Sequence, residues 1–288
     1  MHLVYLACRS TVPSSTNRRV DAFEHDQMMD CLRRAFEPHG GKVSDVAWDD
    51  QTVDWSTFDA ALIGTAWDYP DNLPAFLAAL DMIGAKIPVF NSRALVQWNT
   101  DKGYLRDLGD KGVRLIPTIW LDKVIPRAFG EVFDAFGVDT IIAKRQVGAG
   151  ADGQHKIIRG DAVPEMPHAM MIQPFMPSIV AEGEISFIFI GGEFCHALLK
   201  TAAAGDYRIQ SCYGGKETPL TPSADDIAAA SEVLGACDET PLYARVDMVR
   251  ADDGGLVLME IELVEPFLYP LQGPELGPRL YQAIKARL

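Results

Sequence analysis

The sequence has few cysteines and no long hydrophobic run. Its five cysteines are odd in number, widely spaced and without a CxxC pair, which argues against a disulfide framework or a zinc site. No apolar run approaches the roughly 18 residues of a membrane-spanning helix, and the opening MHLVYLACRS lacks the basic leader of a signal peptide. We therefore expect a cytoplasmic protein with reduced thiols.

Basic residues are also in short supply. The 288 residues include 26 Lys and Arg against 40 Asp and Glu, which gives a net charge of −14. Such a chain repels the phosphates of nucleic acids and of anionic membranes, so we expect neither as a partner. A small anion held in a locally basic cleft is still compatible with this charge.

Strand-like and helix-like segments alternate in the first third of the chain. The apolar runs HLVYLAC, KVSDVAW and DAALIGTAW are separated or followed by helical spacing over 20–36 and 72–83. This βαββα order predicts a small α/β domain over residues 1–94. The remainder is richer in strands, and we expect two α+β lobes there, over 95–175 and 176–288.

Carboxylates interrupt the apolar stretch VLMEIELVEP at 257–266. On a strand, Glu260 and Glu262 lie on the same face, about 7 Å apart. Buried acids that face the same way repel each other and resist ionisation. The arrangement therefore calls either for a cation among the acids or for a solvated sheet face.

A hairpin brings two more charges to these acids. The loop Asp252–Gly255 has turn-forming residues and joins LYARVDMVRA to LVLMEIEL. With a four-residue loop, Asp247 lies opposite Glu260 and Arg245 lies opposite Glu262. Three acids and one arginine then share a face, and an all-oxygen acid cluster suits Mg²⁺ with a phosphate-bearing substrate.

The segment GAGADG, at Gly148–Gly153, matches GxGxxG. A dinucleotide fingerprint requires a helix directly after the glycines, whereas QHKIIRG is strand-like. A Walker A loop is absent, because no Gly-Lys-Ser/Thr ends the segment. A glycine-rich hairpin over nucleotide phosphates fits the pattern, and a plain flexible hairpin is the alternative.

Two motifs beside this loop point to a nucleotide. Lys144 interrupts the apolar strand IIAKR, where a lysine is costly unless it meets an anion or snorkels to water. The connector IQPFM offers a carbonyl at Pro174 and an N–H at Met176, which could bind an adenine edge, with Glu184 near the ribose. The alternative is an ordinary turn.

Basic residues also gather around the segment AAAGDYRIQSCYGG. Lys200 and Arg208 could bind a substrate carboxylate or a transferring phosphate. The alternative is that these side chains are simply solvated.

In this order, the segments resemble the ATP-grasp superfamily and its branch of glutathione synthetase and ribosomal-protein glutamate ligase. The resemblance covers most of the chain from Trp98 to Pro266. It rests on WNTDKGYL, IIAKRQVGAGADG, IQPFM with Glu184, the 200–208 segment with Gly214 and Gly215, and RVDMV paired with MEIELVEP. The pieces WDD, VDW and AWDYP, with WNTDKGYL and GDYRIQ, look closest to the cyclo-ligases of D-cycloserine biosynthesis and their relatives.

The resemblance implies a role for each motif. ATP phosphates would be contacted by Lys102, Lys144, Gly148, Gly150 and Gly153. Adenine and ribose would be bound by Gln173, Pro174, Phe175, Met176 and Glu184. Mg²⁺ would be held by Asp247, Glu260 and Glu262. The transferring phosphate and the substrate carboxylate would be faced by Lys200, Arg208 and Arg245.

The implied fold is α/β plus α+β, with a Rossmann-like pre-ATP-grasp domain followed by two lobes that enclose ATP. The implied reaction is ADP-forming ligation of a carboxylate to an amine through an acyl phosphate, with ATP and Mg²⁺ and a small amino-acid-like substrate. Two alternatives stay open: ring closure within one substrate, of the D-cycloserine kind, and nucleotide binding without catalysis. The expected partners are a small-molecule carboxylate and an amine, and a homodimer is left open.

Overall fold

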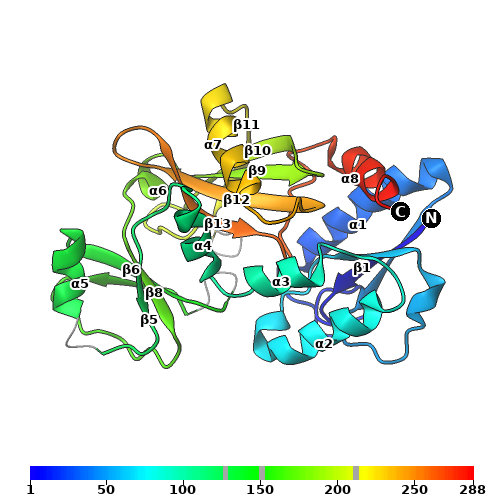
Figure 1. Cartoon of the computed structure of the whole chain (residues 1–288), viewed down its shortest axis with the longest axis horizontal. Helices are drawn as coiled ribbons and strands as arrows, with labels where there is room; N and C mark the ends of the chain where they lie inside the picture. Colours follow the sequence, from blue (N-terminus) through cyan, green and yellow to red (C-terminus); the bar gives the residue numbers. More distant parts are fainter. Residues whose placement is uncertain (126–128, 149–152, 210–213) are drawn as a thin grey trace.

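The computed structural model describes residues 1–125, 129–148, 153–209 and 214–288. These residues form three sheets (Figure 1). In that view the N-terminal sheet lies at the right, the central sheet at the left, and the C-terminal sheet above and between them. The expected combination of α/β and α+β parts is confirmed.

The N-terminal sheet is parallel throughout, as the βαββα pattern predicts. Its order is β2-β1-β3-β4, with β1 His2–Ala7, β2 Lys42–Ala47, β3 Ala60–Ile63 and β4 Val89–Phe90. Its helices are α1 Ala22–Phe36 and α2 Leu73–Gly84, and its 3-10 turns are η1 Glu37–His39, η2 Trp55–Thr57 and η3 Tyr69–Asn72. The central strands β1 and β3 are almost continuously apolar because helices pack on both faces of the sheet, whereas the edge strand β2 carries Lys42, Ser44 and Asp45.

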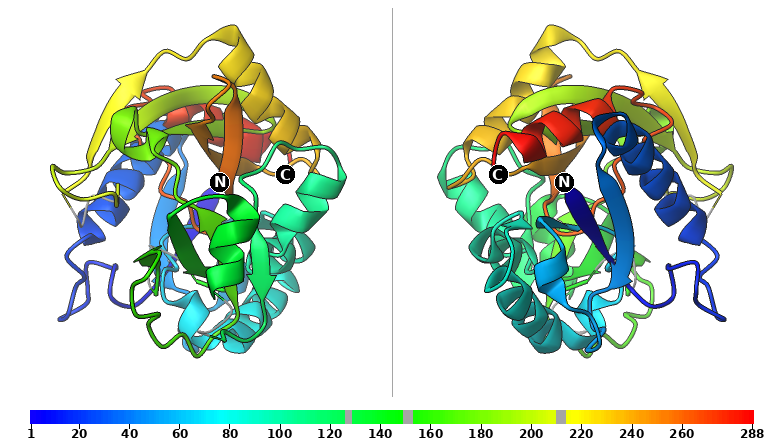
Figure 2. Two further views of the ribbon diagram at one scale, coloured as in Figure 1. Left: turned by 90° about the vertical axis from the view of Figure 1, so that its left-hand side faces the viewer. Right: turned by 90° about the vertical axis from the view of Figure 1, so that its right-hand side faces the viewer.

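Helix α8, Leu276–Lys285, returns the end of the chain to the N-terminal domain. It lies beside α1, as the right-hand view of Figure 2 shows, and Leu280 shares a core with Leu32. The two helices approach closely at Gly277, where a Cβ atom would lie 2.8 Å from the backbone oxygen of Cys31. A larger residue at this position would therefore push the helices apart.

The central sheet is antiparallel and has the order β5-β8-β6-β7. Its elements are β5 Ile119–Leu121, α5 Phe129–Phe136, β6 Thr140–Arg145, β7 His155–Ile158 and β8 Met170–Pro174. Strands β6 and β7 form the hairpin that flanks the glycine-rich segment. A strand rather than a helix follows the glycines, so the exclusion of a dinucleotide fingerprint is confirmed.

The C-terminal sheet has five strands in the order β11-β10-β9-β12-β13. They are β9 Glu184–Ile190, β10 Glu193–Thr201, β11 Lys216–Leu220, β12 Tyr243–Arg250 and β13 Leu256–Glu262. The neighbouring helices are α3 Arg93–Asn99, α4 Tyr104–Asp110, α6 Ser178–Ala181 and α7 Ala224–Gly235. Apolar side chains of α3, α4 and α7 pack on the outer face of this sheet, so its inner face is left for polar groups.

The pairing of β12 with β13 confirms one part of the hairpin prediction and corrects another. Asp247 lies opposite Glu260, and Arg245 lies opposite Glu262, as predicted. The four-residue loop is wrong, because Arg250 pairs with Leu256 and the loop spans residues 251–255. A β-bulge at Met259 then shifts the register by one residue, which restores the predicted pairing of Asp247 with Glu260.

This bulge decides which side chains reach the inner face. Leu256 and Leu258 belong to the outer core, so strict alternation would also have turned Glu260 outward. The extra residue, Met259, breaks the alternation, and Glu260 and Glu262 then face inward. The bulge therefore creates the charged face that strict alternation alone would not give.

Strand β13 lies at the edge of the sheet, and side chains from the preceding helices occupy its free edge. The Asn99 amide donates 2.8 Å to the carbonyl of Ile261 and accepts 2.8 Å from the N–H of Leu263. The Tyr104 hydroxyl accepts 3.1 Å from the N–H of Ile261. These bonds satisfy edge groups that would otherwise be free to pair with another strand.

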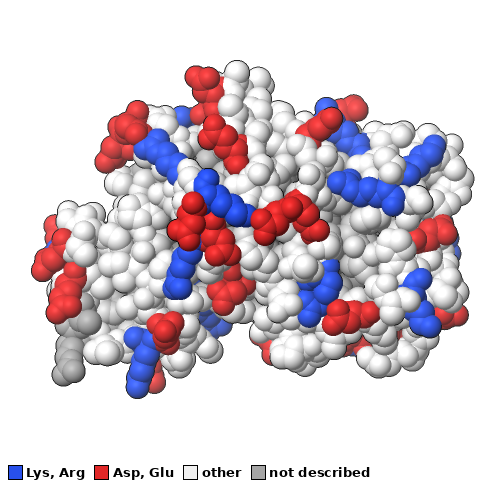
Figure 3. Space-filling view, in the orientation of Figure 1, with Lys and Arg blue, Asp and Glu red and all other residues white. Residues whose placement is uncertain are grey.

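Within the described ranges, no helix is both long and apolar enough to cross a membrane. The described cysteines, Cys8, Cys31, Cys195 and Cys237, are all free, while Cys212 lies outside the described residues. On the face seen in Figure 3, acidic and basic side chains are interspersed rather than gathered by sign.

Candidate active site

A row of polar side chains crosses the inner face of the C-terminal sheet at directly paired positions. We call it the polar row, and its members are Lys200, Glu184, Ser186, Asp247, Arg245, Glu260 and Glu262. Because each member lies opposite another on the neighbouring strand, the register of the sheet alone brings these groups together.

Lys200 and Asp247 link the members at the centre of the polar row. The Lys200 Nζ lies 3.0 Å from Glu184 Oε1 and 3.4 Å from Asp247 Oδ1. The Ser186 hydroxyl donates to the same Asp247 oxygen, and Arg245 Nε donates to both Asp247 oxygens at 3.1 and 2.9 Å. Asp247 is therefore the acid most fully engaged within the protein.

Burial sets the charge of the remaining acids. It raises the pKa of Glu184 to about 7, although Lys200 opposes the shift. It also raises the pKa of Glu262 to about 7, although Arg245 forms an ion pair with that carboxylate. For Asp247, Arg245 and Lys200 outweigh the effect of burial and lower the pKa. Lys200 and Arg245 therefore do not fully offset the cost of placing negative charge on Glu184 and Glu262.

Lys102 connects the polar row to the glycine-rich segment. Its ammonium forms an ion pair with Glu260 and donates 3.1 Å to the carbonyl of Gly148. Its backbone N–H donates 2.8 Å to the carbonyl of Gln146, at the end of β6. Lys102 thus bridges the two places where the resemblance locates phosphate and metal.

A pocket opens beside the polar row, between the central and C-terminal sheets. It is lined by Lys144, Gln173, Pro174, Phe175, Met176 and Glu184, and we call it the hinge pocket. The apolar side chains of Ile116, Ile179, Ile209 and Met259 complete its wall. The structure therefore brings together six of the residues assigned to nucleotide binding, on an apolar surface suited to a flat base.

Lys144 enters this pocket without an ion pair to any described residue. Burial lowers the pKa of its ammonium, and Glu260 opposes that shift only in part. A half-buried lysine without an ion pair is costly in the free protein. An anion at this point would remove the cost, as the sequence pattern predicts.

The other predicted residues lie around the same pocket. Arg208 lines it and forms an ion pair of 2.8 Å with Asp206. Gly148 meets Lys102, as described above, while Gly150 lies outside the described residues. Gly153 has a φ of 66° and would place a Cβ atom 2.4 Å from Arg145 Nε. The backbone conformation therefore favours glycine at position 153. This reason is independent of the predicted role of Gly153 in phosphate binding.

The three acids assigned to Mg²⁺ are tied to cations in this structure. Among the described residues, no group of three His, Cys, Asp or Glu side chains is placed to hold a metal ion. The chemistry of the set nevertheless fits Mg²⁺, because its donors are carboxylate oxygens. Burial raises the pKa of Glu262 although Arg245 opposes the shift, so a further cation beside it would stabilise its charged form. Glu260 and Glu262 are the more available pair, since Asp247 is occupied by Arg245, Ser186 and Lys200.

Sequence reasoning missed Tyr269, which lies under the basic side of the polar row. Lys200 Nζ lies 5.2 Å and Arg245 Cζ 5.8 Å from the centre of its ring, within the range of cation–π attraction. Tyr269 is buried and has a φ of 52°, and such a backbone angle is strained for an aromatic residue. The only signal in the sequence is an aromatic residue next to proline, which is too common to single it out.

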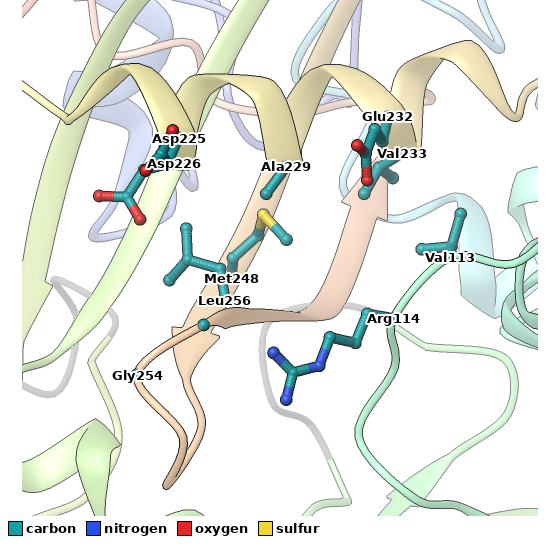
Figure 4. Close-up of a pocket in the computed structure, with 11 residues that line it drawn as sticks. Val113, Arg114, Asp225, Asp226, Ala229, Glu232, Val233, Met248, Gly254 and Leu256 are labelled. Atoms are coloured by element: carbon teal, nitrogen blue, oxygen red, sulfur yellow. The ribbon is translucent and has the colours of Figure 1, made fainter.

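A second pocket, of about 330 Å³, lies on the outer face of the C-terminal sheet. Figure 4 shows its lining, with Asp225 and Glu232 from α7 on one side and Arg114 on the other. It contains none of the predicted site residues. Although it is the larger of the two pockets, the predicted site residues lie in the polar row and the hinge pocket.

Comparisons with known proteins agree with the overall fold. The family of the N-terminal domain of D-cycloserine synthetase DcsG matches residues 3–91. The cycloserine biosynthesis protein DcsG of Streptomyces lavendulae is 28% identical over 265 residues, which cover 84% of this chain and 87% of that protein. The crystal structure of D-cycloserine synthetase DcsG superposes with a TM-score of 0.85 at 24% identity, over 100% of this chain and 99% of that one.

A second group of relatives widens the comparison. The D-alanine–D-alanine ligase from Bacillus anthracis, complexed with ATP, matches with a TM-score of 0.70 at 18% identity, over 99% of this chain and 96% of that one. The chain therefore has the fold of the ATP-grasp ligases. In this fold, the polar row and the hinge pocket are the candidate site.

Proposed function

We propose that this protein is an ATP-grasp ligase, an ADP-forming enzyme that activates a small carboxylate as an acyl phosphate and joins it to a nitrogen. The observation that carries the proposal is the adjacency of the hinge pocket to the polar row through Glu184, which belongs to both. An ATP molecule with its base in the pocket would thereby have its phosphates directed toward Lys144, Lys102 and the acids.

On the nucleotide side, the protein supplies position and charge. The base would lie on the apolar wall, against Pro174, Phe175 and Met176, and Glu184 would meet the ribose hydroxyls. Lys144 would neutralise a phosphate, since it has no ion pair of its own among the described residues, and Glu260 offsets its burial only in part. Lys102 would turn from Glu260 toward the phosphates beneath the glycine-rich segment.

On the substrate side, basic groups would orient the carboxylate. A carboxylate oxygen attacks the γ-phosphorus, the bond to the bridging oxygen breaks, and ADP leaves. A nitrogen then attacks the carbonyl carbon of the acyl phosphate, phosphate leaves, and the nitrogen loses a proton. Arg245 and Lys200 could stabilise the negative charge of both steps, with Arg208 at the rim of the pocket.

Magnesium would be held by Glu260 and Glu262, with Asp247 behind them. When bound, it would draw charge from the phosphates and leave their oxygens less repulsive to a carboxylate. Within the protein, Glu260 must then exchange the ammonium of Lys102 for the metal.

A second candidate is ligation within one molecule, as in ring closure of the D-cycloserine kind. The matches to D-cycloserine synthetase over residues 3–91 and over the whole chain favour it. Both candidates share the activation step and differ in whether the nitrogen belongs to the same molecule as the carboxylate.

The experiment is a screen for ADP release from ATP and Mg²⁺ with carboxylates, amino acids and amines, alone and in pairs. Hydroxylamine should intercept the activated carboxyl group as a hydroxamate. ADP release that needs two compounds supports the first candidate, and release with one compound, converted to a cyclic product, supports the second. If no compound stimulates ADP release, the proposal fails.

A further inference from the structure

We infer that Glu265 binds the ammonium group of the amino-acid-like substrate. The inference rests on the proposed function and adds a substrate-binding residue to it. Three properties of Glu265 carry it: its burial, its lack of a partner and its place between two domains.

Among the described residues, Glu184, Asp247 and Glu265 are the buried acids, and Glu265 is the one without a partner. Only 7% of its surface is exposed, yet its carboxyl group has no hydrogen bond or ion pair with any described residue. Every other buried acid of the site, Glu184 and Asp247, has a lysine or an arginine within hydrogen-bond reach. A buried carboxyl group of this kind is destabilising unless something else supplies the missing partner.

Its position is fixed by contacts on both sides. The backbone carbonyl of Glu265 accepts 3.2 Å from the indole N–H of Trp67, in the loop after β3. The preceding residue, Val264, packs into the N-terminal core, and its carbonyl accepts 2.8 Å from the hydroxyl of Tyr243. Glu265 is therefore held at the junction of the N-terminal domain with the C-terminal sheet, just beyond the end of the polar row.

The side chain interacts electrostatically with the polar row. Burial raises the pKa of Glu265 well above its usual range, Glu262 and Glu260 add to the rise, and Lys102 and Arg245 oppose it. Tyr69 of the N-terminal domain lies close enough to interact with it, because burial and then Glu265 raise the pKa of its phenol. The oxygens of Glu265 are not among the side-chain atoms that are sealed from solvent without a partner.

An ammonium group matches this environment. It brings the positive charge that the acids lack, and its three N–H donors suit a carboxylate and a phenol oxygen. The basic groups Lys200 and Arg245 lie farther along the row and suit the opposite end of the same molecule. A substrate with an ammonium at Glu265 and a carboxylate toward Arg245 would be a zwitterionic amino acid.

The test compares Glu265→Gln, which keeps the shape, with Glu265→Asp, which keeps the charge. The control is Glu275→Gln, which alters an exposed acid in the same C-terminal segment. ADP release is measured with ATP, Mg²⁺ and the protein-forming amino acids in both D and L forms. Each active amino acid is then compared with the same acid lacking its amino group.

We expect the wild-type protein to use an amino acid and to reject its deaminated counterpart. Glu265→Gln should raise the KM for that amino acid by about 10- to 100-fold, with the KM for ATP unchanged. Its thermal midpoint should not fall, because the substitution removes an unpaired buried acid. Glu265→Asp should recover part of the loss, and the control should behave as wild type.

Three results would overturn the inference and leave the ligase proposal standing. The first is efficient use of the deaminated acid by the wild-type protein, and the second is an unchanged KM for the amino acid in Glu265→Gln. The third is a lowered thermal midpoint of Glu265→Gln together with equal increases in the KM for the amino acid and the KM for ATP. The last result would indicate a structural role. If no carboxylate of any kind stimulates ADP release, the proposed function itself fails, and this inference fails with it.

Discussion

Lys200 and Glu184 face each other on neighbouring strands and form a buried ion pair, with Lys200 Nζ 3.0 Å from Glu184 Oε1. Their side chains are only 6% and 4% exposed. The same ammonium lies 3.4 Å from Asp247. One lysine therefore compensates both Glu184, in the hinge pocket, and Asp247, in the polar row. Loss of its charge should leave both carboxylates with less compensation.

Replacing Lys200 with methionine should destabilise the protein strongly. Glu184 and Asp247 would each lose a cation in a buried site, and breaking a buried pair in this way typically costs about 3 kcal/mol or more. The free energy of unfolding in urea at pH 7 measures the effect. Lys216→Met, at an exposed position of the adjacent strand, should stay within about 0.5 kcal/mol of wild type. Equal stability of the two variants would contradict the ion-pair account.

Replacing Lys144 with methionine should weaken ATP binding without destabilising the protein. Its ammonium has no ion pair within the described ranges, and burial lowers its pKa, so the ligand-free protein should keep or gain thermal stability. ATP affinity should fall by about 10- to 100-fold, as expected for loss of one charge-assisted contact. Calorimetric titration with ATP and Mg²⁺ measures this. Unchanged ATP affinity would remove Lys144 from the nucleotide site.

The hairpin shows what a sequence can and cannot specify about this site. Alternation and turn residues were enough to pair Asp247 with Glu260. They could not reveal that the loop is one residue longer and that a bulge at Met259 compensates. A bulge depends on which face the neighbouring layers cover, here the outer core beneath α7, and a single strand does not encode that choice.

Contacts between residues that are far apart in the sequence were harder to predict. Lys144 could be singled out because a charge in an apolar strand needs a partner, whereas Glu184 was singled out only by its place just beyond IQPFM. The contact of Lys102 with Glu260 joins positions 158 residues apart, and Glu265 is held by a bond from Trp67 of the N-terminal domain. Such relationships arise from the packing of domains, and local patterns do not contain them.

His196 provides a prediction for acid stability. Burial lowers its pKa from the usual 6.5 to about 4, so between these values the unfolded chain binds a proton that the folded chain refuses. Stability from this group is complete above pH 6.5 and is lost as the pH falls toward 4, by about 3 kcal/mol at most. His196→Gln should flatten urea-unfolding stability over this range. The exposed His168→Gln variant should not, and equal slopes would contradict the assignment.

Glu260→Gln tests the metal assignment. The amide can still accept a hydrogen bond from Lys102, so the variant should fold, but it cannot balance the charge of a metal ion. Thermal stabilisation by ATP with Mg²⁺ should then fall to that given by ATP alone, and ADP release should drop by a factor of about 100 or more. Glu193→Gln, at an exposed position of β10, is the control. Wild-type turnover in Glu260→Gln would contradict the assignment.

The central claim is that a carboxylate is activated by transfer of the γ-phosphoryl group. The most direct measurement uses a substrate found in the ADP-release screen, labelled with ¹⁸O in its carboxylate. Activation as an acyl phosphate leaves one carboxylate oxygen on the phosphate that is released, so mass spectrometry should find ¹⁸O in inorganic phosphate at one atom per turnover. Turnover that leaves all the ¹⁸O in the organic product and none in phosphate would contradict acyl-phosphate chemistry and the function proposed for the polar row.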